Sequence, residues 1–430
     1  TPNFDLLMKN GICFNQAISS ADGTELSWAS IFTAQYTFQT GLNQSFYNKL
    51  PSKALNYIKI LKNWNYHTYG HIPSGGKFFG ISHDFENKDL VYDADNRLYS
   101  ELGEEILQKF DKNELKEPWF YFIHLLDLHL PIFLPKEFNE EKFGDNEYDR
   151  MVSAIDVWIG KVLEKIDFKN TLIIITSDHG DFIPSIKYKN KTISYFGNES
   201  IHKILWKVEA KIPSALLPIR NKIFAVGRNI RNENKSSKFK DLKLSPYQNR
   251  ALFFNRNDTN GYLFDELVRI PLIFSGFNLE HKIINQQVRH VDIFPTINAI
   301  IKCPEKKENI QGQNLTPLFN DEKLEEKPIY LECRFRGEKN LSRSVVGIRT
   351  SKWKYFRSKD NKKTRVYLFD LENDPLEENN VENSHPKIIE EMEGILKEIR
   401  KDVLPENERG KMTDEETKKV ELELRKLGYI

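Results

Sequence analysis

The sequence has few cysteines, no long apolar run and no excess of charge of either sign. Its three cysteines, Cys13, Cys303 and Cys333, are widely spaced and odd in number, which excludes a disulfide scaffold and a cysteine-built zinc site. No stretch approaches about 18 uninterrupted apolar residues, so no segment is predicted to span a membrane. The 63 Lys and Arg residues face 62 Asp and Glu residues, which argues against a surface wholly adapted to nucleic acid.

Length and composition fit an ordinary globular protein. The chain has 430 residues, of which 39% are hydrophobic and 29% are charged, and these values exclude a disordered or collagen-like chain. A single core is strained at this length, so we expect one large domain and a smaller one. The first residue is Thr1 rather than Met and no signal peptide is visible. We therefore expect the natural N-terminus to lie upstream, and the sequence does not predict a compartment.

Short apolar runs alternate with a helical pattern. Residues 119–126, 171–176 and 270–275 are continuous runs rich in aromatic or β-branched side chains, typical of buried parallel strands. Between the first two runs, apolar residues from Val152 to Ile166 recur every three or four positions and predict a helix lying on a sheet. A further helix is predicted at 2–10. The pattern predicts an α/β fold with a mostly parallel central sheet, in which reactive groups gather at the carboxyl ends of strands.

Two regions differ from this pattern. Residues 187–258 hold 16 Lys and Arg residues against 5 Asp and Glu residues, and we interpret them as a basic insertion. After residue 326, antiparallel strands are predicted at 327–334, 344–357 and 364–371, a helix is predicted near Pro386, and a capping box indicates a last helix from Thr413. We expect a large domain at 1–325 and a smaller α+β subdomain at 326–430.

The strongest local signal follows the predicted strand 171–176. Asp178 and His179 stand side by side there, and a carboxylate and an imidazole at the carboxyl edge of a sheet can both ligate one divalent cation. Gly180 lets the backbone turn sharply after them. For this segment alone, a turn in which Asp178 caps the next helix and His179 lies on the surface is an equally good interpretation.

Two further segments carry groups that can do chemistry. Thr24 precedes a helix predicted from Ser27 onward, and a hydroxyl near a helix N-terminus is well placed to stabilise an alkoxide or an anionic substrate. Taken alone, a helix-capping role for Thr24 or Ser27 is the better interpretation. His124, Asp127 and His129 follow the predicted strand 119–126, where they can bind an anion or protonate a leaving group. Taken singly, each of these three residues is more often a structural residue with satisfied hydrogen bonds, and this interpretation suits His124 and Asp127 best.

Considered together and in order, these segments resemble the motifs of the sulfatase family of the alkaline phosphatase superfamily. The match extends over nearly the whole chain, and seven ordered matches are far more specific than any one of them. The matching segments are 1–11 (TPNFDLLMKNG), 17–33 (the nucleophile segment), 122–131 (FIHLLDLHLP), 175–180 (ITSDHG), 264–274 (FDELVRIPLIF), 290–296 (HVDIFPT) and 367–375 (YLFDLENDP).

The resemblance implies an alkaline phosphatase-like three-layer sandwich with one divalent metal ion, either Ca²⁺, Mn²⁺, Mg²⁺ or Zn²⁺, at the top of its sheet. Asp178, His179 and Thr24 match metal ligands, Thr24 also matches the nucleophile, and His129 matches a catalytic residue and substrate-anion contact near the leaving group. The remaining ligands usually come from acidic residues that end a strand upstream of the 1–11 motif. That strand is absent from this sequence, and we expect it to precede Thr1.

The sequence departs from the family pattern at three places. Sulfatases that form formylglycine carry CxPSR or SxPSR where this chain has 24–28 (TELSW), so no formylglycine can form. Many family members have a cationic residue before the 264–274 motif, where this chain has Asn260. The family's GKWH motif appears here only as residues 69–71 (YGH), which keep His71 but lack the lysine. Asn260 and His71 are the matching substrate-binding candidates. A threonine nucleophile is typical of the superfamily's phosphoethanolamine and phosphoglycerol transferases.

The threonine changes the chemistry that the sequence predicts. Formylglycine hydrate expels sulfate by collapsing to an aldehyde, whereas a threonine ester needs a second displacement at sulfur or phosphorus. Our leading prediction is a metal-dependent sulfatase-like hydrolase of sulfate or phosphate esters, acting on an anionic ester such as a glycan or glycolipid. The alternatives are a phospho-alcohol transferase that acts on a surface glycan and a catalytically inactive binding protein of the same fold.

The basic stretch 187–258 has two interpretations. Its cations, with Arg220, Lys222, Arg228 and Arg231 as candidates, can replace positive charge lost from the pocket or attract an anionic polymer. A solvated, variable insertion explains the same composition and is favoured. No nucleic-acid partner is expected, because no recognition motif accompanies the charge.

Overall fold

The computed structural model describes residues 1–42, 48–93, 95–196, 235, 237–254, 261–304, 309–333, 344–405 and 408–426. The chain forms two compact units. The first comprises Thr1–Leu126, Ile155–Gly180 and Asn260–Val420, and the second comprises Asp127–Ala154, Asp181–Thr259 and Glu421–Ile430. These units do not coincide with the predicted domains 1–325 and 326–430, and the predicted domain border stays a prediction.

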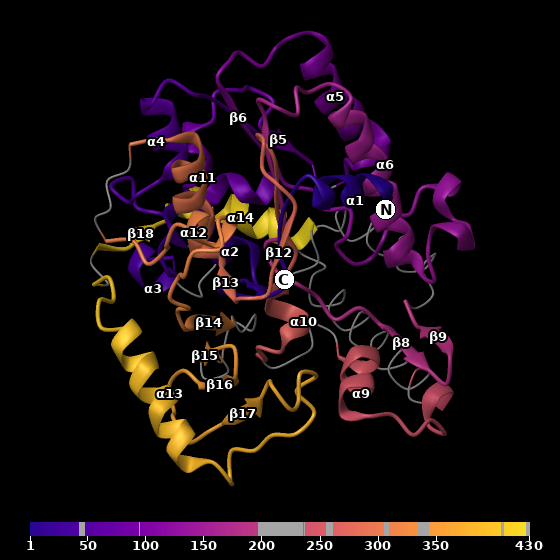
Figure 1. Cartoon of the computed structure of the whole chain (residues 1–430), viewed down its shortest axis with the longest axis vertical. Coiled ribbons are helices and arrows are strands. Elements are labelled where there is room, and N and C mark those ends of the chain that lie inside the picture. Colours follow the sequence, from indigo (N-terminus) through magenta and orange to yellow (C-terminus); the bar gives the residue numbers. More distant parts are fainter. Residues whose placement is uncertain are drawn as a thin grey trace. The chain divides into compact units, whose positions relative to one another are not determined.

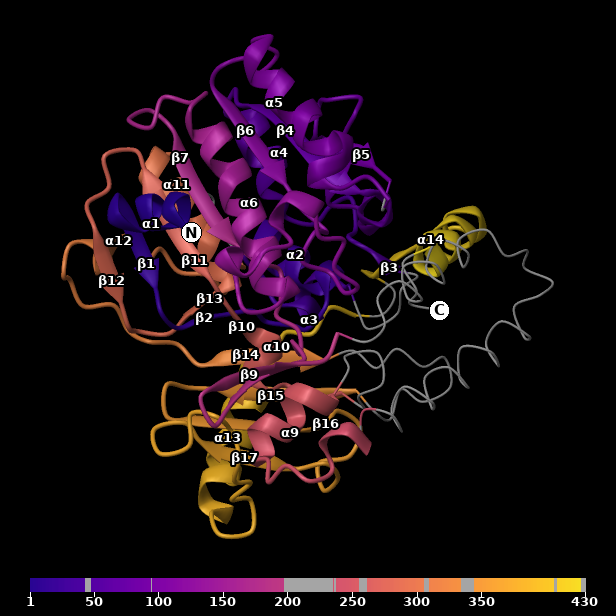
Figure 2. The ribbon, with the colours of Figure 1, turned by 90° about the vertical axis from the view of Figure 1, so that its right-hand side faces the viewer.

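The first unit is built on a mixed four-stranded sheet in the order β12, β1, β11, β7 (Figures 1 and 2). The strand predicted at 171–176 is confirmed as β7. The run at 270–275 contains β11, but this strand runs antiparallel to both β1 and β7, so its prediction as a parallel strand was wrong. Burial on both faces produces the same apolar run in either direction. The strands are β12 (Lys282–Ile284), β1 (Gly11–Phe14), β11 (Leu272–Gly276) and β7 (Leu172–Thr176).

Helices cover both faces of this sheet, which makes the unit a layered α/β structure. On one face, Cys13 and Ile273 pack with Leu7 of α1 (Pro2–Lys9) and Ile159 of α6 (Glu147–Leu163). On the other face, neighbouring strand positions such as Ile12 and Phe274 pack with α2 (Thr24–Thr33) and α11 (Ile293–Ile301). Successive side chains of a strand point to opposite faces, so continuous apolar runs are what this layering requires.

The helix predicted at 2–10 is confirmed as α1, and a buried carboxylate holds its first turn. Asp156 of α6 accepts hydrogen bonds from the backbone N–H groups of Asn3 and Phe4 at 3.0 and 2.7 Å and from Nδ2 of Asn3 at 3.1 Å. The N–H groups of a first helical turn have no partner within the helix. The carboxylate supplies one, and it ties the 1–11 motif to the helix that covers the sheet.

A second sheet of the same unit carries the predicted strand 119–126. Its order is β5, β4, β6, and both pairings are parallel. Helix α4 packs on β4, and its first turn is capped by Asn56, whose side chain accepts from the N–H of Ile58. The elements are β5 (Val91–Tyr92), β4 (His67–Pro73), β6 (Trp119–Ile123), α4 (Tyr57–Asn63) and α5 (Gly103–Asp111).

The predicted antiparallel strands after residue 326 are confirmed, but they number one more than expected. The segment predicted as a single strand at 344–357 is a hairpin of two strands, and the sheet order is β14, β15, β16, β17 with every pair antiparallel. Helix α13 packs on this sheet through Met392 and Leu396 (Figure 1). The elements are β14 (Ile329–Cys333), β15 (Val345–Arg349), β16 (Trp353–Ser358), β17 (Tyr367–Asp370) and α13 (Pro386–Ile399).

Two of the matched motifs meet in a buried network of charges. Lys354 of β16 has a fully buried side chain whose Nζ lies 2.7 Å from Asp265 and 2.9 Å from Glu377. Arg349 contacts Asp265 at 3.0 Å, and the backbone N–H of Asp265 donates to Glu377 at 2.6 Å. Asp265 of the 264–274 motif and Glu377, which follows the 367–375 motif, therefore join the C-terminal sheet to the rest of the unit.

The pKa values of the two carboxyl groups of this network are shifted in opposite directions. Burial and the nearby Asp265 raise the pKa of Glu377 to about 7, although Lys354 opposes the shift. Burial alone would raise the pKa of Asp265 as well, but Lys354 and Arg349 hold it well below its usual value. Asp265 is therefore ionised at neutral pH, while Glu377 is close to its titration point.

A more exposed carboxylate links α13 to the same sheet. Glu393 contacts Arg357 at 2.8 Å and Lys362 at 3.0 Å, and it accepts from the Tyr355 hydroxyl at 2.8 Å. Burial opposes ionisation, but these hydrogen bonds lower the pKa of Glu393 to about 2. The contact is therefore a favourable ion pair at neutral pH.

Short elements complete the first unit. The last helix begins as predicted, because Thr413 and Glu416 exchange the two hydrogen bonds of a capping box. Among the described helices, none is both long and apolar enough to cross a bilayer. The remaining elements are β2 (Ala17–Ile18), β3 (Asn48–Lys49), β10 (Arg269–Ile270), β13 (Val288–Arg289), β18 (Gly410–Lys411), α3 (Thr37–Thr40), α10 (Asp265–Val268), α12 (Thr316–Phe319) and α14 (Asp414–Lys426).

The second unit contains a small hairpin and a helix from the basic stretch. Strands β8 (Ser185–Tyr188) and β9 (Lys191–Ser194) pair antiparallel, and α9 (Pro246–Phe253) packs on β8. A capping box of Ser245 and Gln248 closes the first turn of α9. The candidates Arg220, Lys222, Arg228 and Arg231 lie outside the described residues.

Candidate active site

The loop after β7 presents Asp178 and His179 at the carboxyl end of the strand, as predicted. Three contacts from distant segments hold its backbone: Ser19 Oγ donates to the carbonyl of Asp178 at 2.8 Å, and His290 Nε2 contacts the carbonyl of Ser177 at 2.9 Å. The N–H of Gly180 donates to the carbonyl of Leu267 at 2.8 Å. The 17–33, 264–274 and 290–296 motifs therefore each support the loop.

Gly180 is required for a reason other than the sharp turn predicted from the sequence. A Cβ atom at this position would lie 2.1 Å from the carbonyl oxygen of Glu266, whereas Gly180 does not have a positive φ. The glycine is needed because the two backbones approach closely. This approach fixes the distance between the Asp178 loop and the 264–274 motif.

Thr24 meets this loop from the start of α2. The helix begins at Thr24 itself, three residues earlier than predicted, with Gly23 as an extended N-cap residue. Thr24 Oγ1 donates a hydrogen bond to Asp178 Oδ2 at 2.5 Å. A hydroxyl at the N-terminus of a helix and a carboxylate at the end of a strand, 154 residues apart in the sequence, thus form one cluster.

Two histidines lie close to the same carboxylate oxygen. Nε2 of His179 is 3.4 Å and Nε2 of His124 is 3.5 Å from Asp178 Oδ2, and all three side chains are at most 15% exposed. The ring of His124 stands edge-on to Trp28 of α2, with 4.9 Å between the ring centroids. His124 is the first residue after β6, so the carboxyl ends of β6 and β7 and the beginning of α2 converge.

The electrostatics of the cluster favour an ionised carboxylate. Burial alone would raise the pKa of Asp178, but His179, His124 and the Thr24 hydroxyl hold it well below its usual value. Burial lowers the pKa of His290 to about 4, so the ring of His290 is neutral and supports the loop as a hydrogen-bond partner. The cluster can therefore hold a cation or orient a hydroxyl proton.

The C-terminal sheet contacts the segment that leads to Thr24. The N–H of Glu332 donates to the carbonyl of Ser20 at 2.9 Å, and residues 21 and 332 form a parallel β-bridge. The thiol of Cys333 donates to Asp22 Oδ2 at 3.1 Å. The end of β14 thus extends alongside the residues before Thr24 and positions them.

The structure does not bring every predicted site residue to this cluster. His71 is buried on β4, where its Nδ1 bonds the Tyr121 hydroxyl at 2.7 Å and its Nε2 lies 3.8 Å from Asp89. Burial lowers the pKa of His71 to about 4. His129 belongs to the second unit, where its Nδ1 contacts the carbonyl of Leu130, and Asn260 lies outside the described residues. The substrate-contact roles of these three residues stay predictions.

His124 is the member of the cluster that the sequence interpretation undervalued. Its position directly after an apolar run was the available signal, but a single histidine there is more often structural. The Nδ1 atom of His124 is buried and has no hydrogen-bond partner among the described residues, while its Nε2 faces Asp178. Buried polar atoms without a partner are uncommon in native structures, which makes His124 a further candidate site residue.

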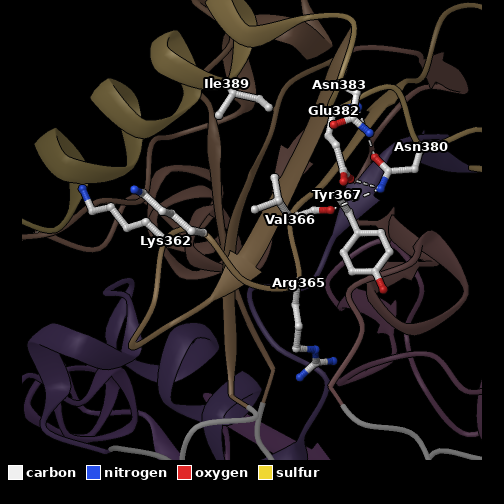
Figure 3. A pocket seen from close by; sticks show the side chains of 9 residues that line it. Lys362, Arg365, Val366, Tyr367, Asn380, Glu382, Asn383 and Ile389 are labelled. Carbon is white, nitrogen blue, oxygen red and sulfur yellow. Dashed lines mark hydrogen bonds between the residues drawn. The ribbon is translucent and has the colours of Figure 1, made fainter.

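An open pocket of about 550 Å³ lies elsewhere, on the C-terminal sheet (Figure 3). Lys362, Arg365, Tyr367, Asn380 and Glu382 are among its lining residues, and Asn380 Nδ2 donates to the carboxylate of the nearby Glu382. Lys362 contacts Glu393 and Arg365 donates to the carbonyl of Gly261, so these cations already have partners. The pocket contains none of the predicted site residues.

The donor types of the cluster are those that hold a divalent cation. Asp178 offers a carboxylate oxygen, His179 and His124 offer imidazole nitrogens, and Thr24 offers a hydroxyl. The described part of the chain nevertheless holds no group of three or more His, Cys, Asp or Glu residues arranged to bind an ion. These residues would therefore hold a metal only together with further ligands.

The comparisons with known proteins agree with this layout. The family model described as "Sulfatase" matches residues 1–301, and the model described as "N-sulphoglucosamine sulphohydrolase, C-terminal" matches residues 256–402. The fold and the matched motifs define a protein of the alkaline phosphatase superfamily. Because the first model covers well over half of the sequence, the chain belongs to the sulfatase family, whose members typically bind a divalent metal.

Two curated relatives match part of the chain. An N-acetylgalactosamine-6-O-sulfatase of Bacteroides thetaiotaomicron is 20% identical over 311 residues, which is 68% of this chain and 49% of that protein. An uncharacterized protein of Haemophilus influenzae is 31% identical over 127 residues, which is 29% of this chain and 19% of that protein. The chain thus spans about half or less of the length of these relatives.

Solved structures with the same fold cover almost the whole chain. A phosphonate monoester hydrolase of Agrobacterium radiobacter has a TM-score of 0.65 and 14% identity, covering 94% of this chain and 91% of that one. The protein Ps i-CgsB in complex with k-i-k-neocarrahexaose has a TM-score of 0.59 and 18% identity, covering 98% and 92%. At such identities the likeness establishes the α/β fold with its C-terminal antiparallel sheet.

Proposed function

We propose that this chain is a sulfatase-like hydrolase that cleaves sulfate or phosphate esters with Thr24 as the nucleophile. The observation that carries the proposal is the 2.5 Å hydrogen bond from Thr24 Oγ1 to Asp178 Oδ2, in a cluster that also includes His124 and His179. This bond holds the hydroxyl proton at the carboxylate and leaves the lone pairs of Oγ1 for the attack. The helix N-terminus at Thr24 stabilises negative charge that develops nearby.

The proposed reaction has two displacements. Thr24 Oγ1 gives its proton to Asp178 and forms a bond to sulfur or phosphorus while the bond to the ester oxygen breaks, and the leaving alcohol takes a proton from His129. Water then attacks the same sulfur or phosphorus atom and gives a proton to His129. The bond from that atom to Oγ1 breaks, and Oγ1 takes its proton back from Asp178 as sulfate or phosphate is released. A divalent cation bound at Asp178, His179 and Thr24 would lower the pKa of the attacking hydroxyl and neutralise charge on the transferred group.

The substrates of similar proteins favour an anionic ester of a saccharide. The matched relatives include an N-acetylgalactosamine-6-O-sulfatase, and one structural neighbour was crystallised with its substrate D-glucosamine-2-N,6-O-disulfate. The phosphonate monoester hydrolase supports phosphorus chemistry on the same fold. We therefore propose a glycan or glycolipid that carries sulfate or phosphate esters.

The test uses the full-length protein with added Mn²⁺, Ca²⁺, Mg²⁺ or Zn²⁺ and a panel of aryl sulfates, aryl phosphates and aryl phosphodiesters. Thr24→Val keeps the volume of the side chain and removes the nucleophile, while Thr24→Ser keeps the hydroxyl. We expect Thr24→Val to lower kcat at least about a thousandfold, and Thr24→Ser to stay within about tenfold of the wild type. Full activity of Thr24→Val on any substrate that is turned over refutes the assignment.

A second candidate function is a transferase that moves a phospho-alcohol group to a surface glycan. The observation that favours it is the threonine itself, because its ester cannot collapse and must pass its group to an acceptor. Adding a saccharide acceptor to the hydrolysis assay separates the two functions. A transferase makes the saccharide ester at the expense of free phosphate, whereas a hydrolase releases the same amount of phosphate with or without the acceptor.

A further inference from the structure

The described part of the basic stretch folds into a small module with an apolar core of its own. In the second unit, Ile186 of β8, Phe239, and Ala251 and Leu252 of α9 are buried together. Gln248 of α9 also donates to the carbonyl of Lys187 at 3.0 Å. The hairpin and the segment before α9 are therefore held side by side, and their exposed side chains share one module.

Six lysines of this module are exposed. Three stand at alternate positions of the hairpin, at Lys187, Lys189 and Lys191. The other three lie just before α9, at Lys238, Lys240 and Lys243. Because Lys187 pairs with Thr192 and Lys191 pairs with Tyr188, these two side chains point to opposite faces of the hairpin. We call the six residues together the lysine surface. Among the described residues 185–196 and 237–254, Asp241 is the single acidic residue. Two carboxylates reach the hairpin from outside: Asp145 bonds Thr192 at 2.9 Å, and Asp149 interacts electrostatically with Lys187.

Aromatic rings and a tight turn limit the positions of these charges. Lys189 and Asn190 both have positive φ, 46° and 62°, which is the two-residue turn that best matches the twist of a hairpin. The Nζ atom of Lys189 lies 5.4 Å from the ring centroid of Tyr188, and that of Lys238 lies 5.6 Å from the centroid of Tyr195. These cation–π contacts hold the ammonium groups beside half-buried tyrosines.

The concentration of positive charge is specific to this part of the chain. The whole protein has a formal net charge of +1, while the stretch 187–258 has 16 basic and 5 acidic residues. The remainder of the chain is therefore acidic overall. The described residues of the module, 185–196, 235 and 237–254, hold 8 Lys and Arg residues against 1 Asp residue.

We propose that the lysine surface binds an anionic polysaccharide through its sulfate or phosphate groups. Lysine ammonium groups are compact point charges that suit such groups. Arginine, which reads base edges in nucleic acids, occurs once in the described module, as the buried Arg250. The large exposed hydrophobic side chains of the described residues all lie outside the module, which disfavours insertion into a membrane.

This binding is separate from the chemistry at Thr24, so the experiment can distinguish the two proposals. The full-length protein is titrated with fluorescein-labelled dextran sulfate, with uncharged dextran of the same length as reference, and fluorescence anisotropy is recorded between 50 and 300 mM salt. The triple variant Lys187→Gln, Lys189→Gln, Lys191→Gln is compared with the wild type. Three exposed lysines of another region, changed as Lys53→Gln, Lys59→Gln, Lys62→Gln, provide a control with the same loss of charge.

We expect dextran sulfate to bind and uncharged dextran not to bind. The hairpin variant should raise the dissociation constant at least tenfold at 100 mM salt and reduce the log–log salt slope by about two, while the control variant should bind within about twofold of the wild type. Thr24→Val should bind as the wild type does, whether or not it hydrolyses esters. Circular dichroism of both triple variants separates loss of binding from loss of folding.

Three results would overturn the proposal. One is equal binding by the hairpin variant and the wild type. Another is equal loss of binding in the hairpin and control variants, which would show a response to net charge alone. The third is binding of poly(dT), or of vesicles that contain phosphatidylglycerol, that is tighter than binding of dextran sulfate and depends equally on the hairpin lysines. This result would assign the surface to a nucleic acid or a membrane.

Discussion

Replacing Lys354 by methionine should destabilise the protein strongly, because this lysine neutralises two buried carboxylates. Its side chain is fully buried and lies 2.7 Å from Asp265 and 2.9 Å from Glu377. Methionine has a similar length without the charge, so Arg349 is the remaining cationic partner that the described residues offer to Asp265. Removing one member of a buried ion pair costs about 3–5 kcal/mol.

The pKa of Glu377 sets the expected value near the lower end of this range. Burial and Asp265 already raise this pKa to about 7, so protonation of Glu377 in the variant relieves part of the repulsion. A carboxyl group with a raised pKa favours the folded state at low pH and loses this contribution as pH rises through about 7. The cost of Lys354→Met should therefore be about 3 kcal/mol at pH 7 and increase from pH 5.5 to pH 8.

Urea unfolding followed by circular dichroism at pH 5.5, 7 and 8 measures this cost. The neighbouring Lys352 is half-exposed and lies 3.2 Å from Glu372, so Lys352→Met is a matched control that should change the free energy of unfolding by less than about 1 kcal/mol. The double variant Lys354→Met, Glu377→Gln should recover part of the loss. Equal stability of Lys354→Met and Lys352→Met would refute the role of the network.

Three further predictions follow from individual contacts. Gly180→Ala should lower the free energy of unfolding by about 2–3 kcal/mol and reduce ester hydrolysis, because the new Cβ would lie 2.1 Å from the Glu266 carbonyl oxygen. Gly394→Ala, in an open helical position, should instead raise the free energy of unfolding by up to about 1 kcal/mol. Urea unfolding measures both changes. Glu393→Gln should lower the free energy of unfolding by about 1–2 kcal/mol at pH 7 and by clearly less at pH 2.5. The lowered pKa of about 2 stabilises the fold above about pH 4.5, and this contribution is lost as pH falls through about 2. Divalent metal at a concentration of about one hundred times its Kd should stabilise the full-length protein by about 2.7 kcal/mol in thermal unfolding. Asp178→Asn should abolish this stabilisation. An equal stabilisation of Asp178→Asn and the wild type would place the ion elsewhere.

The order of motifs predicted the family, and apolar runs located β6, β7, β11 and the strands of the C-terminal sheet, but the sequence could not predict strand direction. β11 is buried and β7 is half-buried, and both pack apolar side chains on two faces, so their side chains follow the same pattern. The direction of β11 depends on its pairing with β1, some 260 residues away along the chain. Local patterns do not contain such pairings, which is why the prediction of a parallel strand at 270–275 was wrong.

The candidate site was predictable to the extent that its residues stand in motifs. Thr24, Asp178 and His179 were singled out in the sequence, and the structure brings them together. His124 was interpreted as structural, because its contact with Asp178 depends on the end of β6 lying against Trp28 of α2. The buried contacts of Asp265 and Glu377 were likewise hidden, since both motifs were matched without any indication that they share Lys354.

The most direct test of the central claim is the mass of the protein during turnover. Full-length protein with metal and a substrate that it hydrolyses is quenched in acid within one turnover, and peptide fragmentation locates any covalent sulfuryl or phosphoryl group. We predict the adduct on Thr24, with none in Thr24→Val. An adduct on another residue, or turnover that continues in Thr24→Val, would contradict the account.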